Sequence, residues 1–486
     1  MSLPQETLVS HNMRLFLAVI VLITPTSGET PAVHVSLTDK ALHYGAYVGA
    51  QWMTDKLKDV SIPDISGEIY ILFDNLHYTL MGITIENVEF PEPSVEFYPG
   101  RGLDTSVSDV SVTLTGGWIT RFGLIQDGGT FQMIVFDTDV TFAVQLGRGV
   151  GGHPFVTSVN CEAHVGGVDM QFRGGASWIF QPFVSKYRDR VRGEIEDKIC
   201  PQLKESIIML DYRLQVFGVS IDVNKDLTLD LGLTDDPVID VSSLNVGLKG
   251  VIYSIKTHAE PPSEPQPFSL AEQPDSMLTL GVSEFTLNSA SYAYYSAGLL
   301  QILLNDSMIP SYSPVHLNTS SFGAFIPQLP KMYPGLLMNL QLYAREVPVV
   351  SFQPGLVTLD LQGAVKAYAI QPTGAQIPLF TLNTDSKFSG KVWTAGGRLK
   401  GSAEMKNLTV TLEATEIGGF ETAALENLAR VGAKLAITKL NQRLGKGVEL
   451  PRLKHAELTN TTLEVEMGFI TISTDAQISL TEDSTD

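Results

Sequence analysis

The sequence has little positive charge and none of the common catalytic motifs. It holds 33 Lys and Arg against 53 Asp and Glu in 486 residues, a net charge of −20. Nucleic acids and anionic membrane surfaces require clustered positive charge, so we expect no nucleic-acid partner. H-E-x-x-H, G-x-S-x-G and C-x-x-C are absent, and the 9 histidines are scattered without helical ligand spacing. The residues therefore indicate no enzyme, no metal site and no cofactor.

Long apolar runs are also scarce. The stretch at 13–28 has one arginine, an apolar run, Pro25 and then small residues. That layout is typical of a secretory signal that is too short to span a bilayer. The alternative is a short buried strand. We expect an exported, extracellular protein without a transmembrane segment.

Cysteine is nearly absent, with only Cys161 and Cys200 in the whole chain. Oxidising compartments preserve disulfides, so export predicts a bond between the two. The alternative is a pair of buried free thiols. Four N-x-S/T sequons also fit an exported product with exposed loops. The expected glycosylation sites are Asn305, Asn318, Asn407 and Asn460.

Alternation of apolar and polar residues dominates the rest of the chain, as in VSVTLTGG (110–117) and LTVTLEA (408–414). Such alternation predicts antiparallel sheet with one apolar face. Four segments change to helical spacing, and we expect Pro201 to stop or kink the second. The order helix, meander, long helix, strands occurs twice, which predicts a duplicated α+β domain.

A proline-rich stretch separates the two copies and predicts a stiff linker. The expected domains are 1–28, an N-terminal extension and signal peptide; 29–257, an N-terminal barrel; 258–275, the linker; 276–475, a C-terminal barrel; and 476–486, an acidic tail.

The apolar faces of the helices allow two interpretations. One is ordinary core packing; the other is that the helices leave slots for a hydrocarbon ligand. Gly49 and Ala46 are small where a core-filling helix favours leucine, although small residues also permit close helix–sheet packing. Expected lining residues are Leu42, Ala46, Gly49, Met53, Tyr187, Val191, Ile195 and Ile199 in the first copy, and Tyr292, Tyr295, Leu299, Ile302, Leu428 and Leu435 in the second.

Several segments resemble the secreted lipid-binding family that includes bactericidal/permeability-increasing protein and lipopolysaccharide-binding protein. They are AVHVSLTDKALHYGAYVGAQ (32–51) with the following IPD, the cysteine pair, SFGAFIPQL (321–329) and LNQRLGKGVELP (440–451). The resemblance implies an elongated boomerang of two twisted barrels with long helices, joined by a central antiparallel sheet. It also implies two apolar pockets that each hold a phospholipid, and a disulfide that ties a strand to the long second helix.

The expected tip of the first barrel departs from the family, whose best-known members bind lipopolysaccharide there through Lys and Arg. The tip residues here are Lys56, Lys58, Trp118, Arg121 and Phe122, with acidic residues around them. Trp118 and Phe122 either enter lipid or are ordinary strand residues.

Three functions remain. The first is innate defence against Gram-negative bacteria, with phospholipid, lipopolysaccharide or the outer membrane as partner of a monomer. The second is phospholipid transfer without endotoxin specificity. The third is a structural β protein whose cores are filled.

Overall fold

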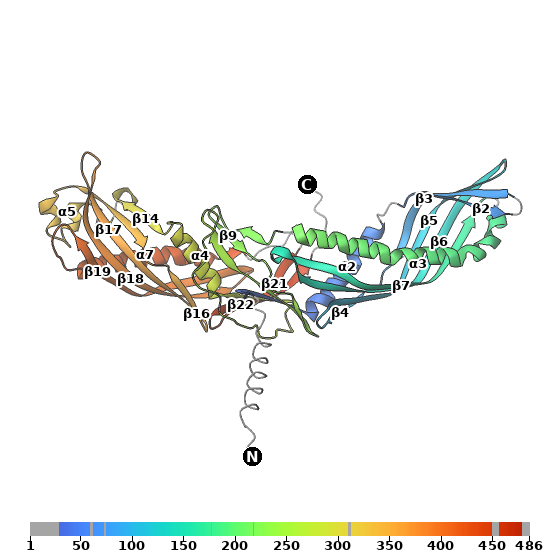
Figure 1. Cartoon of the computed structure of the whole chain (residues 1–486). Helices are drawn as coiled ribbons and strands as arrows, with labels where there is room; N and C mark the ends of the chain where they lie inside the picture. The colour runs from blue at the N-terminus through green and yellow to red at the C-terminus, as the bar shows by residue number, and fades with distance from the viewer. Residues whose placement is uncertain are drawn as a thin grey trace, which may run out of the picture.

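The computed structural model describes residues 29–58, 62–71, 74–175, 177–216, 218–309, 313–449 and 456–478. Figure 1 shows an elongated molecule, in which a wing of curled sheet and helices lies at each end and a further sheet lies between them. The expected signal peptide at 1–28 lies outside the described residues, as do residues 479–486 of the expected tail. The last strand reaches Ile478, so the first residues assigned to that tail belong to the sheet.

The N-terminal wing is an antiparallel meander between two helices. Its strands are β2 (Ile65–Ile71), β3 (Asp74–Glu89), β5 (Gly102–Phe122), β6 (Ile125–Arg148) and β7 (Pro154–Arg173), and β4 (Ser94–Tyr98) pairs with β5. The 3₁₀ turn η1 (Val150–Gly152) joins β6 to β7. Helix α2 (Asp39–Lys58) precedes the meander and α3 (Ser177–Val216) follows it.

The C-terminal wing repeats this plan. Its sheet order is β14 (Gln301–Asn305), β15 (Leu337–Ala344), β17 (Leu356–Ile370), β18 (Gln376–Thr394), β19 (Arg398–Thr415) and β20 (Val448–Glu449), with β16 (Val349–Gln353) on β17. Helix α4 (Glu284–Ser296) precedes the meander and α7 (Ala423–Lys446) follows it; η2 (Asp306–Met308), α5 (Thr319–Phe322) and α6 (Leu329–Met332) are short turns. The predicted duplication is therefore confirmed in the order of the elements.

A central antiparallel sheet takes strands from both halves of the chain. Its order is β10 (Val238–Ile239), β11 (Ser243–Leu248), β1 (Val33–Thr38), β13 (Leu278–Ser283), β22 (Phe469–Ile478) and β21 (Ala456–Val465). The halves meet where β1 pairs with β13, with Val35 opposite Leu280. A small sheet of β12 (Val251–Ser254), β9 (Leu227–Asp230) and β8 (Ser220–Asp222) lies beside it. The α+β boomerang expected from the resemblance is confirmed.

Helix α3 covers the edge strand β7 of the N-terminal wing. A carboxylate oxygen of Glu196 accepts a hydrogen bond from the Val165 backbone N–H at 2.8 Å. An oxygen of Asp211 does the same for the Val156 N–H at 3.0 Å. Edge strands expose unpaired backbone groups, and these acidic side chains satisfy two of the N–H groups on β7.

Helix α7 covers β19 in the same way, beyond the two residues of β19 that pair with β20. Glu426 accepts from the Val410 N–H at 3.1 Å, and the Asn441 amide bonds both the N–H and the carbonyl of Ala403 at 2.7 and 2.9 Å. The Arg430 side chain and the Val410 N–H hold the pKa of the Glu426 carboxyl below its usual range. Asn441 follows Glu426 by the same 15 residues that separate Asp211 from Glu196. The duplication thus extends to the contacts that fix each long helix.

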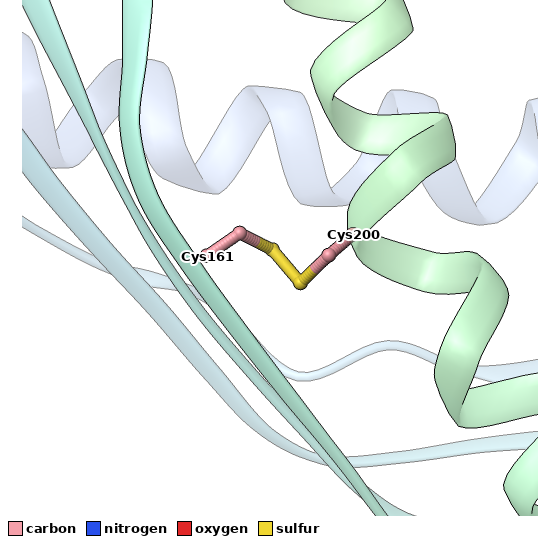
Figure 2. The surroundings of a disulfide bond; sticks show 2 residues. All are labelled: Cys161 and Cys200. Carbon is pink, nitrogen blue, oxygen red and sulfur yellow. A yellow bond between two sulfur atoms is a disulfide. The ribbon is translucent and has the colours of Figure 1, made fainter.

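The disulfide between Cys161 and Cys200 is present, with Cα atoms 5.7 Å apart. Figure 2 shows it joining strand β7 to helix α3. Of the two effects expected of Pro201, a stop or a kink, the stop was wrong, because α3 continues to Val216. Proline removes one backbone hydrogen bond, and the contacts of α3 with β7 at Cys200 and Asp211 hold the helix on both sides of it.

The third predicted helix is shorter than the spacing indicated. Helix α4 ends at Ser296, so Leu299 lies in a turn and Ile302 lies in β14. Gly298 causes the stop, since its φ of +69° is a left-handed conformation that glycine adopts readily. Tyr292 and Tyr295 remain on the helix.

The proline-rich linker packs on the central sheet. The Phe268 ring stacks on Phe469 with centroids 4.5 Å apart and meets His34 edge-on at 4.6 Å. Gly281 lies beneath Leu270 and Phe268, and a Cβ there would come within 2.5 Å of Leu270. Burial in this contact lowers the pKa of His34.

Asp475 on β22 ties the two halves together. Its carboxylate accepts hydrogen bonds from Lys40 Nζ at 2.8 and 2.9 Å, from the Met277 N–H at 3.1 Å and from Asn460 Nδ2 at 2.9 Å. Asp475 is only 8% exposed. Burial by itself raises the pKa of Asp475, but the bonds from Asn460, Lys40 and Met277 outweigh it and lower the pKa.

Removing the disulfide with Cys161→Ser and Cys200→Ser should lower the free energy of unfolding by about 4 kcal/mol, because the bond closes a loop of 39 residues. Urea unfolding monitored by circular dichroism measures the change. A Ser206→Ala variant, also on α3, is the control and should unfold like the parent. An unchanged urea midpoint in the double variant would contradict the expected role of the bond.

Asp475→Asn should cost about 2 kcal/mol near neutral pH, because the variant loses charged hydrogen bonds in a buried site. Because the pKa of Asp475 is lowered in the folded protein, its ionised carboxylate stabilises the fold at pH values above the ordinary carboxyl pKa of about 3.9. This contribution to the free energy of unfolding is lost as the pH falls through the lowered pKa. The gap in melting temperature between parent and variant should therefore close below about pH 4. Asp360→Asn, in the exposed pair with Lys387, is the control. A gap that stays constant down to pH 2 would refute the role of the charge.

Candidate functional site

One side of helix α2 faces open space. Gly45, Gly49, Trp52 and Met53 fall on this side, and the two large side chains are 49% and 37% exposed. A Cβ built on Gly45 or Gly49 would meet no atom within 4 Å. Close helix–sheet packing, the alternative reason for small residues, is therefore wrong at these two positions. Both glycines are exposed, and no protein atom lies directly in front of them.

The flanks of the same helix are packed. Val48 and Ala50 are buried, and Leu42 packs against a cluster that contains Phe97 and Leu244. Ala46 is half-buried between Leu42 and Ala50. Helix α2 is thus fixed along its sides while the stripe at Gly49 stays uncovered.

Helix α3 is covered in its middle and open near its end. Val191, Ile195 and Ile199 pack against a buried cluster on β6 and β7. The side chain of Tyr187 lies outside the described residues. Beyond Cys200 five apolar side chains are at least half exposed, namely Ile208, Met209, Leu210, Tyr212 and Val216, whereas Ile207 is buried.

Helix α7 shows the same change along its length. Leu425 and Leu428 belong to the C-terminal core, whereas Val431 and Leu435 are 58% and 65% exposed. Leu435 lies on the same helix face as Leu428, two turns later. The face of α7 that packs on the core therefore continues beyond the core, where its apolar side chains are exposed.

Strand β14 places Ile302 beside the C-terminal core. Its neighbour on the same strand face, Leu304, packs against that core, yet Ile302 is 52% exposed. Tyr295 does not lie on the core side with Ile302. It borders a groove that Gln301 also lines, and the side chains of Gln301 and Ile302 are on opposite faces of β14. The Tyr295 hydroxyl donates to the Arg345 carbonyl at 2.8 Å. Of the residues expected around the second pocket, Ile302, Leu428 and Leu435 come to the core side.

Tyr292 and Leu299 complete the set expected in the second copy. Tyr292 is half-buried on α4, and Leu299 is 40% exposed in the turn after it.

The central sheet adds an apolar face that the sequence analysis missed. Its residues alternate with the polar positions that face the linker, and each is half-buried: Val35, Leu278, Leu280, Val282, Ile470 and Ile472. The hydrophobic clusters formed by the described residues do not include them. The sequence signal for this face is the alternation of apolar and polar residues in VHVSLT, LTLGVS and FITIST. The alternation identifies one shared apolar face only when the three strands are known to be neighbours in the sheet.

The tip of the N-terminal wing is apolar, but not through Trp118. Trp118 is 2% exposed, and its Nε1 donates to the carbonyls of Thr130 and Arg173 at 3.1 and 3.3 Å. Of the two alternatives for Trp118, insertion into lipid was wrong, and Trp118 is an ordinary strand residue whose indole fills the end of the sheet. The exposed residues are instead Leu124 and Ile125, at 101% and 70%, in the β5–β6 turn.

The charged residues expected at the tip do not form a basic cluster among the described side chains. Lys58 Nζ lies 3.8 Å from Asp55, and Arg121 is exposed on β5 beside the half-buried Phe122. The side chain of Lys56 lies outside the described residues.

The four sequons differ in their surroundings. Asn407 is exposed on β19, and Asn305 accepts a hydrogen bond from Ser307. Asn318 caps α5 by accepting from the Ser321 N–H. Asn460 donates through Nδ2, the atom that glycosylation modifies, to the buried Asp475.

The described residues offer neither a metal site nor a membrane-spanning helix. No group of three or more His, Cys, Asp or Glu in the described ranges is placed to hold a metal ion. Within the same part of the chain, no helix is both long and apolar enough to cross a membrane.

Known proteins of similar sequence and structure agree with this architecture. Residues 41–212 match the N-terminal domain of the LBP / BPI / CETP family, and residues 221–478 match its C-terminal domain. A bactericidal permeability-increasing protein from Sebastes schlegelii is 36% identical over 95% of this chain and 98% of its own. The human lipopolysaccharide-binding protein is 26% identical over 95% and 97%. A crystal structure of lipopolysaccharide binding protein aligns with a TM-score of 0.58 and 25% identity over 93% of this chain and 100% of its own. The chain belongs to the LBP / BPI / CETP family.

Proposed function

We propose that this chain is an extracellular lipid-binding protein of innate defence. It holds the acyl chains of phospholipid or lipopolysaccharide in two apolar pockets, one in each wing, and acts as a monomer against Gram-negative bacteria. The names of the relatives, lipopolysaccharide-binding protein and bactericidal permeability-increasing protein, support the ligand class. The observation that carries the proposal is the open space in front of Gly45 and Gly49.

The uncovered apolar residues define where the ligand would lie. In the N-terminal wing the stripe of α2 at Gly49 and Met53 faces vacant volume. In the C-terminal wing Leu435 and Ile302 lie on the same side of the sheet as the core, and both are exposed. The apolar face of the central sheet lies between the two sites and provides a floor. A soluble protein gains nothing from uncovered apolar surface of this extent unless a ligand or partner covers it.

The energetics suit a reversible carrier. Burying about 30 methylenes of two acyl chains stabilises them by roughly 24 kcal/mol relative to water, at about 0.8 kcal/mol each. A bilayer provides nearly the same stabilisation, so movement between membrane and pocket is close to neutral. Such a site needs apolar volume and requires no catalytic group.

Phospholipid transfer without endotoxin specificity is the second candidate. The charge of the chain favours it, because the net charge is −20 and Lys58 at the tip lies near Asp55. Capture of lipid A phosphates relies on clustered Lys and Arg. Binding of lipopolysaccharide across a range of salt concentrations separates the two candidates, since charge-led capture weakens steeply with salt.

Gly49→Leu should lower the lipid that co-purifies with the secreted protein by at least half, because leucine fills the vacant volume in front of α2. Native mass spectrometry with lipid extraction measures occupancy, and the parent should carry close to two phospholipids. Gln51→Leu places the same leucine side chain on the opposite side of the helix and should leave occupancy unchanged. A parent protein without lipid would refute the proposed function. Unchanged occupancy in Gly49→Leu alone would place the pocket elsewhere.

Leu124→Asp combined with Ile125→Asp should weaken binding to phosphatidylcholine vesicles at least tenfold, because each buried side chain contributes about 1.5–3 kcal/mol. Vesicle flotation measures the change, and a weak dependence on salt is expected for apolar insertion. Val150→Asp, at a position that is 97% exposed outside the tip, is the control. Equal flotation of parent and double variant would exclude the β5–β6 turn as the docking element.

A further inference from the structure

A groove of about 380 Å³, lined by polar and apolar atoms in similar amounts, lies against the outer face of the C-terminal sheet. Tyr295, Gln301, Gln341, Tyr343 and Lys366 line it. The volume falls within the range of small-molecule sites, about 300–1,000 Å³. Because side chains alternate along a strand, this groove and the uncovered Ile302 lie on opposite faces of β14. The groove is therefore separate from the proposed lipid pocket.

Hydrogen bonds fix the orientation of the two glutamine amides in the groove. Gln301 Nε2 donates to the Gly298 carbonyl at 3.1 Å. Gln341 Nε2 donates to Gln301 Oε1 at 3.3 Å, and the Tyr368 hydroxyl donates to Gln341 Oε1 at 3.4 Å. This chain crosses β14, β15 and β17, so the polar surface is ordered before any ligand arrives.

The groove has one charged residue, Lys366, in a strongly acidic protein. The ion pairs among the described residues do not include Lys366, and its Nζ lies 5.9 Å from the centre of the Tyr368 ring. By contrast, Arg345 on the same wing pairs with Asp385 at 2.6 Å, and Lys387 pairs with Asp360 at 3.5 Å. Lys366 thus presents an ammonium group that has no carboxylate to neutralise it.

We propose that this groove binds a saccharide that carries a phosphate or carboxylate group. Planar amides donate and accept in pairs, which matches the vicinal hydroxyls of a sugar. The Tyr295 and Tyr343 rings offer apolar contact area together with a hydroxyl, which suits the C–H face of a pyranose. The Lys366 ammonium supplies a charge-assisted bond to the acidic substituent.

Two sources present this chemistry, namely the phosphorylated and carboxylated core sugars of lipopolysaccharide and the acidic glycosaminoglycans of host tissue. Isothermal titration calorimetry on the full-length secreted protein separates them. The probes are the lipid-free core oligosaccharide released by mild acid, a heparin tetrasaccharide, and neutral maltotetraose. We expect at least one acidic probe to bind more tightly than maltotetraose, and the stronger acidic probe identifies the source.

Lys366→Ala should weaken binding of the acidic probe about tenfold and leave maltotetraose unaffected, because it removes one charge-assisted contact. Gln341→Leu should weaken binding of acidic and neutral probes alike. Lys387→Ala, a lysine on the same sheet that already has a carboxylate partner, is the control for net charge. All variants should keep the parent melting temperature, since these side chains lie at the surface.

The proposal is overturned if neither acidic probe binds with a Kd below about 1 mM. It is equally overturned if Lys366→Ala and Lys387→Ala bind the acidic probe alike. Lipid occupancy is measured separately by native mass spectrometry, so failure here leaves the proposed lipid pockets standing.

Discussion

The backbone groups that β7, and β19 beyond its short pairing with β20, leave without a neighbouring strand are the constraint on which the rest of the molecule depends. A curled sheet with a free edge needs partners for its backbone groups, and here they come from side chains of a long helix. Glu196 and Asp211 serve one edge, while Glu426 and Asn441 serve the other. A helix held along an edge at points four turns apart cannot sink into the hollow of the sheet. These contacts hold α3 and α7 along the edges of their sheets and stabilise each wing.

The central sheet gives the two wings a common frame. Because β1 pairs with β13, and Lys40 and Asn460 both bond Asp475, the first helix and the last strand are fixed to each other. The linker contributes through Phe268, which covers the polar side of this sheet. The apolar side remains between the wings, where a hydrocarbon ligand in either site would meet it.

The sequence predicted the order of elements, the disulfide and the two-winged shape, because alternation and helical spacing are local signals and the family resemblance supplied the assembly. It failed where long-range contacts decide. Pro201 did not end its helix, because contacts on either side hold α3 in place, whereas Gly298 ended α4 before Leu299. Trp118 was predicted as a tip residue, but its indole N–H donates to the carbonyl of Arg173, which is 55 residues away in the sequence. The linings of the proposed pockets could be predicted only in part. Tyr295 and Ile302 fit one helical repeat in the sequence, but Ile302 lies on the core side of β14, whereas Tyr295 borders the groove on the other side of the sheet.

The two long helices are secured by different chemistry at matching positions. Cys200 follows Glu196 by four residues and is covalently bound to Cys161. Arg430 follows Glu426 by the same interval and donates to the Leu408 carbonyl as well as to Glu426. A reducing environment would therefore release the covalent bond of α3 to β7 and leave the Arg430 contacts of α7 unchanged. In an oxidising environment, which preserves disulfides, both long helices stay bound to their sheets.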